Sequence, residues 1–157
     1  MNNLTIARAI HILSIMIWIG GVGFVTAVLI PTIRRSAHKK DQLSIFNAIE
    51  NRFALIARFA VAITGISGIY MVYVLNAWDR FVEIRYFWIH AMVLLWLMFV
   101  IALFIIEPFF FKNHGRIVKD HHAITNLRKT EIVHWIIFIL SLITIFFSVL
   151  GAHGFLY

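Results

Sequence analysis

One apolar run near the start of the chain constrains the fold more than any other feature. Residues 9–31, AIHILSIMIWIGGVGFVTAVLIP, contain no Asp, Glu, Lys or Arg. Because about 20 apolar residues are enough to cross a bilayer as one helix, this run predicts a membrane span. The run is too long for the apolar core of a cleavable signal peptide, about 7–15 residues, so we expect it to stay as a permanent first span.

Three further apolar runs follow the first along the chain. Together they predict spans at about residues 6–31, 53–75, 87–108 and 132–152. Charged residues make up only 13% of the chain, against about 25% in soluble domains. The expected fold class is therefore all-α. We expect one integral membrane domain, residues 1–157, folded as an up-down-up-down transmembrane four-helix bundle.

Positive charges between the spans predict the orientation. The connections 32–52 and 109–130 each hold five Lys or Arg, whereas the connection between spans two and three holds only Arg80 and Arg85. Since cytoplasmic loops are enriched in Lys and Arg, we place the two long connections in the cytoplasm and both termini outside. The expected location is a bacterial inner (cytoplasmic) membrane. The net charge of +7 then indicates contact with anionic lipid, not nucleic acid.

Four histidines fall in or at the ends of the predicted spans, and an imidazole in hydrocarbon is costly without a partner. From a rise of 1.5 Å per residue, His11 and His90 both lie about 10 Å outward of the midplane. By the same estimate His153 lies about 16 Å outward and His134 about 12 Å inward. The histidines of the long connections, His38, His114, His121 and His122, are expected to be solvated.

The shared depth of His11 and His90 favours a haem between them. Diagonal helices of a four-helix bundle lie roughly 12–14 Å apart, which suits a haem with two axial histidines. Arg8, one turn before His11, could pair with a propionate, as could Arg85. We expect one haem b near the outer side, with His153 or His134 as alternate ligands and a second, inner haem left open. The alternative is that each histidine simply bonds a backbone carbonyl or a serine.

A second polar group is expected toward the inner side. Arg58, Glu107, Glu131 and His134 fall at similar depth, where charges normally pair with one another. An Arg58–Glu107 ion pair that holds the helices together is the expected arrangement, and a proton or quinone site is the alternative. Glycines in spans one and two, Gly20, Gly21, Gly23, Gly65 and Gly68, predict close helix packing or, alternatively, room for a flat macrocycle.

Four short motifs resemble a known superfamily. They are IHILSIMIWIGG, IENRFALIARF, FWIHAMVLLWLMF and IVHWIIFILSLITI, one for each span. They are similar to the superfamily that joins CopD-type membrane proteins with HemJ-type protoporphyrinogen oxidases. This resemblance implies a four-helix membrane protein with haem b, histidine ligands at His11 and His90, and a functional arginine at Arg52.

Together these observations predict a small membrane cytochrome b that transfers single electrons, with a quinol as a candidate donor. Two rivals stay open, a HemJ-type protoporphyrinogen IX oxidase and a CopD-like copper transport protein. The copper-transport hypothesis is weakened because the candidate methionine ligands lie at different depths in the predicted spans. They are Met16, Met71, Met92 and Met98. The chain has no cysteine, which excludes disulfides and thiolate chemistry. The lipid bilayer is the expected partner, and homo-oligomers and oxidoreductase activity remain open.

Overall fold

The computed structural model describes residues 2–35, 39–108 and 123–155. Its elements are α1 (Asn2–Phe24), the π-helix η1 (Val25–Leu29), α2 (Ile30–Arg35), α3 (Lys39–Val74), the 3-10 helices η2 (Trp78–Phe81) and η3 (Ile84–Tyr86), α4 (Phe87–Val100), the π-helix η4 (Ile101–Ile106) and α6 (Ala123–Ala152). These ranges contain helices and no strand, which confirms the all-α prediction. The expectations for His38, His114, His121 and His122 fall outside the described residues.

Within the described ranges, four helical segments are long and apolar enough to cross a membrane. They run over Asn3–Arg34, Asn51–Val74, Ile84–Ile106 and Arg128–Ala152. Each overlaps one of the four predicted spans, and side chains such as Leu94 and Ile66 are 67% and 71% exposed on their surfaces. Large apolar side chains exposed along four such helices are typical of a multi-pass membrane protein.

The two prolines of the chain each follow a π-helix. η1 ends two residues before Pro31, and η4 ends two residues before Pro108. Proline lacks the N–H for the bond to residue i−4 and its ring crowds that carbonyl, so a locally widened turn relieves the clash. The prediction that span one ends at Pro31 is therefore wrong, because α2 continues the helix to Arg35.

The segment 41–52, whose apolar residues Leu43, Phe46, Ala48 and Ile49 predict an amphipathic helix at the membrane interface, does not form a helix of its own. It belongs to α3, which continues without a break from Lys39 to Val74. At 36 residues and a rise of about 1.5 Å per residue, α3 is longer than a bilayer crossing requires. The predicted second span, 53–75, coincides with the apolar part of this helix, Asn51–Val74.

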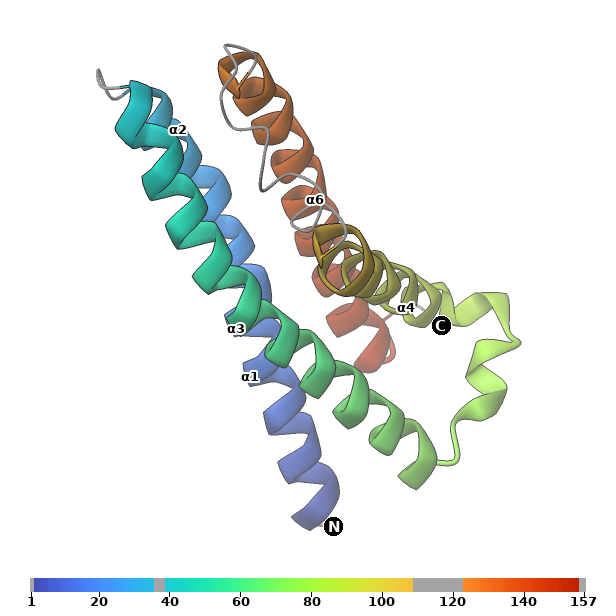
Figure 1. Cartoon of the computed structure of the whole chain (residues 1–157). Helices are drawn as coiled ribbons and strands as arrows, with labels where there is room; N and C mark the ends of the chain where they lie inside the picture. The colour runs from blue at the N-terminus through green and yellow to red at the C-terminus, as the bar shows by residue number, and fades with distance from the viewer. Residues whose placement is uncertain (1, 36–38, 109–122, 156–157) are drawn as a thin grey trace.

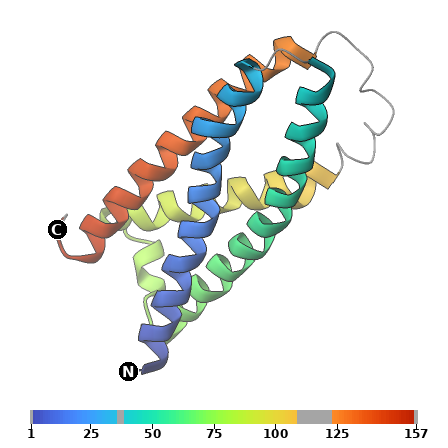
Figure 2. The same cartoon turned by 90° about the vertical axis from the view of Figure 1, so that its left-hand side faces the viewer.

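The helices form two packed pairs. α1 packs along α3, and α4 packs against α6. Figure 1 shows α1 and α3 side by side and running in opposite directions, so that the start of α1 and the end of α3 lie at the same end of the molecule. Figure 2 shows α4 crossing the direction of α1 and α3 obliquely. This arrangement leaves much of α4 and α6 exposed.

The core lies where α1, α3 and α4 meet. The indole of Trp18 packs edge-on against Phe99, with ring centroids 4.7 Å apart, and both rings contact Val61 and its neighbours in one apolar cluster. At its edge, Trp96 donates a hydrogen bond from Nε1 to the carbonyl of Val61 at 2.9 Å. Aromatic side chains thus join α1 and α4 to α3.

The glycines of the spans mostly receive aromatic rings from other helices. A Cβ at Gly21 would fall on the ring of Phe53, one at Gly23 on Phe138, one at Gly65 on Trp96 and one at Gly151 on Trp88. At Gly21, Gly23 and Gly65 the expected close packing is confirmed, whereas a Cβ at Gly20 would meet nothing within 4 Å. The space that was considered for a macrocycle at Gly21, Gly23 and Gly65 is filled by protein side chains.

Candidate functional site

The imidazole of His11 turns toward α3. Its Nδ1 lies 3.0 Å from the carbonyl oxygen of Thr64 and 3.0 Å from Oγ of Ser67, and its ring rests over Gly68, where a Cβ would lie 3.3 Å from Cε1. Because a carbonyl only accepts, Nδ1 carries the proton, and Nε2 of the neutral ring has the lone pair. No described residue hydrogen-bonds Nε2, so this nitrogen is available to a ligand.

The imidazole of His90 is engaged at both nitrogens. Nε2 lies 2.9 Å from the carbonyl oxygen of Phe81, and Nδ1 lies 3.2 Å from that of Tyr86. The ring of Phe81 also meets that of His90 edge-on. Since a neutral imidazole has one N–H, it can donate to only one of the two carbonyls. The shorter contact is the one from Nε2, so this nitrogen is covered by the turn η2.

The two alternate histidines lie on α6 and directly after its last residue, Ala152, and each bonds a carbonyl one turn earlier. Nδ1 of His134 lies 2.9 Å from the carbonyl of Thr130, and Nδ1 of His153 lies 2.9 Å from that of Val149. His134 is half-buried, whereas His153 is exposed. Within the described ranges, no cluster of three or more His, Cys, Asp or Glu is close enough to hold a metal ion.

The arginines expected near the outer side differ in their surroundings. Arg8 is exposed on the first turns of α1, where the sequence predicted it. The side chain of Arg85 already forms an ion pair with Glu83 and lies over the ring of Tyr86, with Cζ 5.1 Å from the ring centroid. Arg8 therefore remains the more available of the two for an anionic group.

The predicted ion pair between Arg58 and Glu107 is confirmed. Nη2 of Arg58 lies 3.2 Å from Oε1 of Glu107, and Nε donates to the carbonyl of Leu103 at 3.0 Å. Arg58 thereby joins α3 to the π-helix η4 and its C-terminal end. Glu131, expected in the same group, pairs instead with Arg34 at 2.6 Å, so this inner group is divided between two ion pairs.

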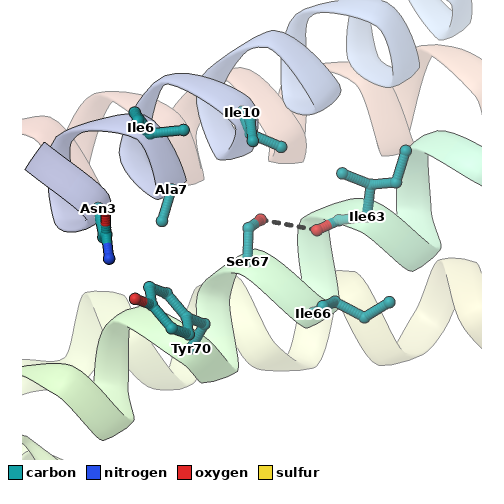
Figure 3. Close-up of a pocket in the computed structure, with 8 residues that line it drawn as sticks. All are labelled: Asn3, Ile6, Ala7, Ile10, Ile63, Ile66, Ser67 and Tyr70. Atoms are coloured by element: carbon teal, nitrogen blue, oxygen red, sulfur yellow. Dashed lines mark hydrogen bonds between the residues drawn. The ribbon is translucent and has the colours of Figure 1, made fainter.

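An open groove lies between α1 and α3, beside His11. Its volume is about 370 Å³, and its wall is formed by apolar side chains with Asn3, Ser67 and Tyr70 among them. Figure 3 shows Asn3 and Tyr70 together at one end and Ser67 between the two helices. The Ser67 hydroxyl that donates to the carbonyl of Ile63 is also the one that approaches His11. The groove suits an apolar chain whose polar end lies toward Asn3 and Tyr70.

A second open groove lies where η1 faces the first half of α3. It measures about 500 Å³ and is lined by Phe24, Val25, Ala48, Ile49, Arg52, Phe53 and Ile56. Arg52 is the cationic residue of this lining. An amphiphile with an apolar body and an anionic group fits this combination of side chains.

His11 has the hydrogen bond that is typical of a metal-binding histidine, whereas His90 has contacts at both ring nitrogens. Histidines that bind metals usually donate the other ring N–H to a carbonyl or carboxylate, which fixes the tautomer, and the bond from His11 to Thr64 has this form. His90 presents no free Nε2, because the carbonyl of Phe81 covers it. His11 and His90 also turn to different elements, α3 and η2.

Sequence reasoning missed the groups that position these histidines. The carbonyl of Thr64 is a backbone atom and has no sequence signal. Thr64, Ser67 and Gly68 do lie at helical spacing i, i+3 and i+4, which places them on one face of α3. A search for small or hydroxyl residues at this spacing would have found the surface that receives His11.

Comparison with known proteins identifies no relative. No protein-family model, curated protein or solved structure matches the chain. The function must therefore be argued from the residues themselves.

Proposed function

We propose that the protein is a small membrane cytochrome b, with His11 as its first haem ligand. The observation that supports this most directly is the hydrogen bond from Nδ1 of His11 to the carbonyl of Thr64. It holds the imidazole against α3 and leaves the lone pair of Nε2 for iron. We further propose the up-down-up-down topology in a bacterial inner membrane, with both termini outside, from the charges of the long connections.

In the described arrangement His90 has no free nitrogen, so we propose it as the second ligand only after a rearrangement. Its ring would first have to leave the carbonyl of Phe81, at the expense of one hydrogen bond. His153 and His134 are the alternates, since each holds Nδ1 on a carbonyl of its own helix. Bound haem b would supply one-electron redox chemistry, and two histidine ligands favour electron transfer over oxygen activation. Arg8 would pair with a propionate.

A membrane quinol is the proposed redox partner. The groove between α1 and α3 supports this, because it offers apolar walls to an isoprenoid tail and includes Ser67, which contacts His11. Asn3 and Tyr70 at its end are polar side chains that could hold a quinol ring (Figure 3).

The proposal is tested by purifying the protein and recording a reduced-minus-oxidised spectrum. We expect a haem b band in the wild type, complete loss of it in His11→Ala and a weakened or shifted band in His90→Ala. Thr144→Ala is the control, because its hydroxyl bonds the carbonyl of Leu140 on its own helix, outside the proposed ligands, and it should leave the band unchanged. Absence of the band in the wild type, or an unchanged band in His11→Ala, would refute the proposal.

A second candidate function is protoporphyrinogen oxidation of the HemJ type. The groove that contains Arg52 supports it, because a porphyrinogen has an apolar macrocycle with carboxylate side chains. Expression in a strain that lacks protoporphyrinogen oxidase separates the two functions. An oxidase restores growth without added haem, and Arg52→Ala abolishes the rescue while the haem band persists. A plain electron carrier fails to rescue.

A further inference from the structure

The connection between α3 and α4 carries apolar side chains that the protein does not cover. Val82 is 86% exposed, Ile84 is 89% exposed and Trp78 is 52% exposed. Figure 1 shows this connection rising from the lower end of α3 to the start of α4 along the outside of the helices. We propose that this segment, residues 75–86, is a membrane-surface anchor whose apolar side chains lie in the lipid headgroup region.

The backbone of the segment is suited to a poorly hydrated environment. Several of its N–H groups bond nearby carbonyls: that of Ala77 bonds Val72, that of Arg80 bonds Ala77, that of Val82 bonds Asp79 and that of Tyr86 bonds Glu83, at 2.9–3.3 Å. The carbonyl of Phe81 is capped by His90. Unsatisfied backbone groups are costly near hydrocarbon, so these local hydrogen bonds lower the cost of placing the two 3-10 turns beside lipid.

The charges of the segment are balanced and partly shielded. Asp79 and Glu83 offset Arg80 and Arg85, so its formal charge is zero. Arg85 pairs with Glu83, and the guanidinium carbons of Arg80 and Arg85 lie 5.5 and 5.1 Å from the ring centroid of Tyr86. These contacts lower the cost of bringing the arginines to the headgroup level, where they can also meet lipid phosphates.

A lipid surface is favoured as the partner by the residue types and by their position. Trp78 and Tyr86 combine an apolar ring with a polar tip, which is the composition of interfacial aromatic belts. The segment is also continuous on both sides with helices of membrane-spanning length, Asn51–Val74 and Ile84–Ile106. This inference stands on the α3–α4 connection alone and does not depend on haem binding.

The absence of cysteine in the chain allows a direct test on the full-length protein. Single-cysteine variants Val82→Cys and Ile84→Cys are labelled with an environment-sensitive fluorophore and placed in nanodiscs of phosphatidylethanolamine and phosphatidylglycerol. Asp79→Cys, in the same segment, is the control for a water-facing site. Leu94→Cys, exposed on α4, is the control for deep lipid. Circular dichroism checks that each variant is helical. Two test positions are used so that the result does not depend on the folding of a single variant.

We expect labels at Val82 and Ile84 to show emission shifted to shorter wavelength relative to Asp79. They should be quenched by nitroxides on lipid headgroups and protected from aqueous iodide, whereas Leu94 responds to nitroxides placed deep in the acyl chains. Emission and iodide quenching equal to those of Asp79 would overturn the proposal. Protection from iodide without quenching by headgroup nitroxides would also overturn it, in favour of a protein partner or a second copy of the chain.

Discussion

α3 and α6 are both long apolar helices with polar side chains, but they use these side chains differently. α3 accepts hydrogen bonds from His11 of α1 and Trp96 of α4, and Arg58 donates from it to η4. On α6, the hydroxyls of residues 141, 144 and 148 and the imidazoles of residues 134 and 153 bond carbonyls one turn earlier on the same helix. Among the described contacts of α6 side chains, the ion pair between Glu131 and Arg34 connects α6 to another helix, α2.

This difference indicates which helix organises the molecule. In lipid, apolar side chains gain little by leaving one helix for another, so small residues and polar contacts determine which helices associate. α3 buries Ala54, Ala57 and Ala60 and has polar contacts on two sides, whereas α6 is held by aromatic and aliphatic packing. Changes on α3 should therefore affect the site and the stability more than equivalent changes on α6.

The largest effect is expected from Gly68→Leu on α3. A Cβ at this position lies 3.3 Å from Cε1 of His11, so a leucine displaces the imidazole from Thr64 and Ser67. Loss of the groups that orient a metal-binding histidine typically lowers affinity by about 10–100-fold. Haem titration of the purified apoprotein measures this. Gly20→Leu is the control, because a Cβ there meets nothing within 4 Å. Equal affinities in the two variants would contradict the role of α3 in positioning His11.

The next largest effect is expected from breaking the Arg58–Glu107 pair. Both side chains are partly buried, at 30% and 21% exposure, so Arg58→Leu leaves an uncompensated carboxylate. We expect a loss of about 1–3 kcal/mol in unfolding free energy, below the value for a fully buried pair. Arg34→Leu, which removes a pair with a more exposed arginine at 48%, should cost about 1 kcal/mol or less. Denaturant unfolding in detergent micelles measures the unfolding free energy of both variants. A larger loss in Arg34→Leu than in Arg58→Leu would contradict the conclusion that α3 organises the molecule.

A smaller effect is expected from the tryptophans that flank α3. Trp96→Phe removes the hydrogen bond to the carbonyl of Val61 and should cost about 0.6–1.7 kcal/mol, the range found for such bonds in membranes. Trp18 is the matched case, since its buried Nε1 has no partner among the described residues. Trp18→Phe removes an unsatisfied donor, so its cost should come from the lost ring volume alone, with no contribution from a hydrogen bond. The same unfolding assay measures both variants. Trp18→His, which has a smaller ring with an N–H, should be less stable than Trp18→Phe, and the opposite order would contradict this account.

The smallest effect is expected on α6. Ser141 is fully buried, but its hydroxyl donates to the carbonyl of Ile137 one turn earlier. That carbonyl also accepts a backbone hydrogen bond within the helix and keeps this partner when the hydroxyl is removed. Ser141→Ala should therefore change the unfolding free energy by less than about 0.6 kcal/mol. Ser67→Ala on α3 is its counterpart, and it should in addition weaken haem binding, because Ser67 approaches Nδ1 of His11. A stronger effect at Ser141 than at Ser67 would reverse the comparison between the two helices.

Much of the helical framework could be predicted from residue type and run length. The four spans and the Arg58–Glu107 pair could be predicted from two facts alone: charge is costly to expose to hydrocarbon, and a helix needs a minimum length to cross it. The continuation of the helix past Pro31 could not be predicted, because it depends on how the preceding π-helix absorbs the proline ring. The orientation of His90 could not be predicted either, since it is set by a backbone carbonyl in the turn η2 that has no sequence signal.

The sequence by itself determined that the described residues include four helices long and apolar enough to cross a membrane, because hydrophobicity and length are properties of each segment alone. It also determined that histidines and arginines would need partners. Only the tertiary structure decided which partners they have. His11 meets Thr64 and His90 meets Phe81, because the rotation of each helix about its axis is fixed by glycines and aromatic rings that interlock between segments far apart in the chain.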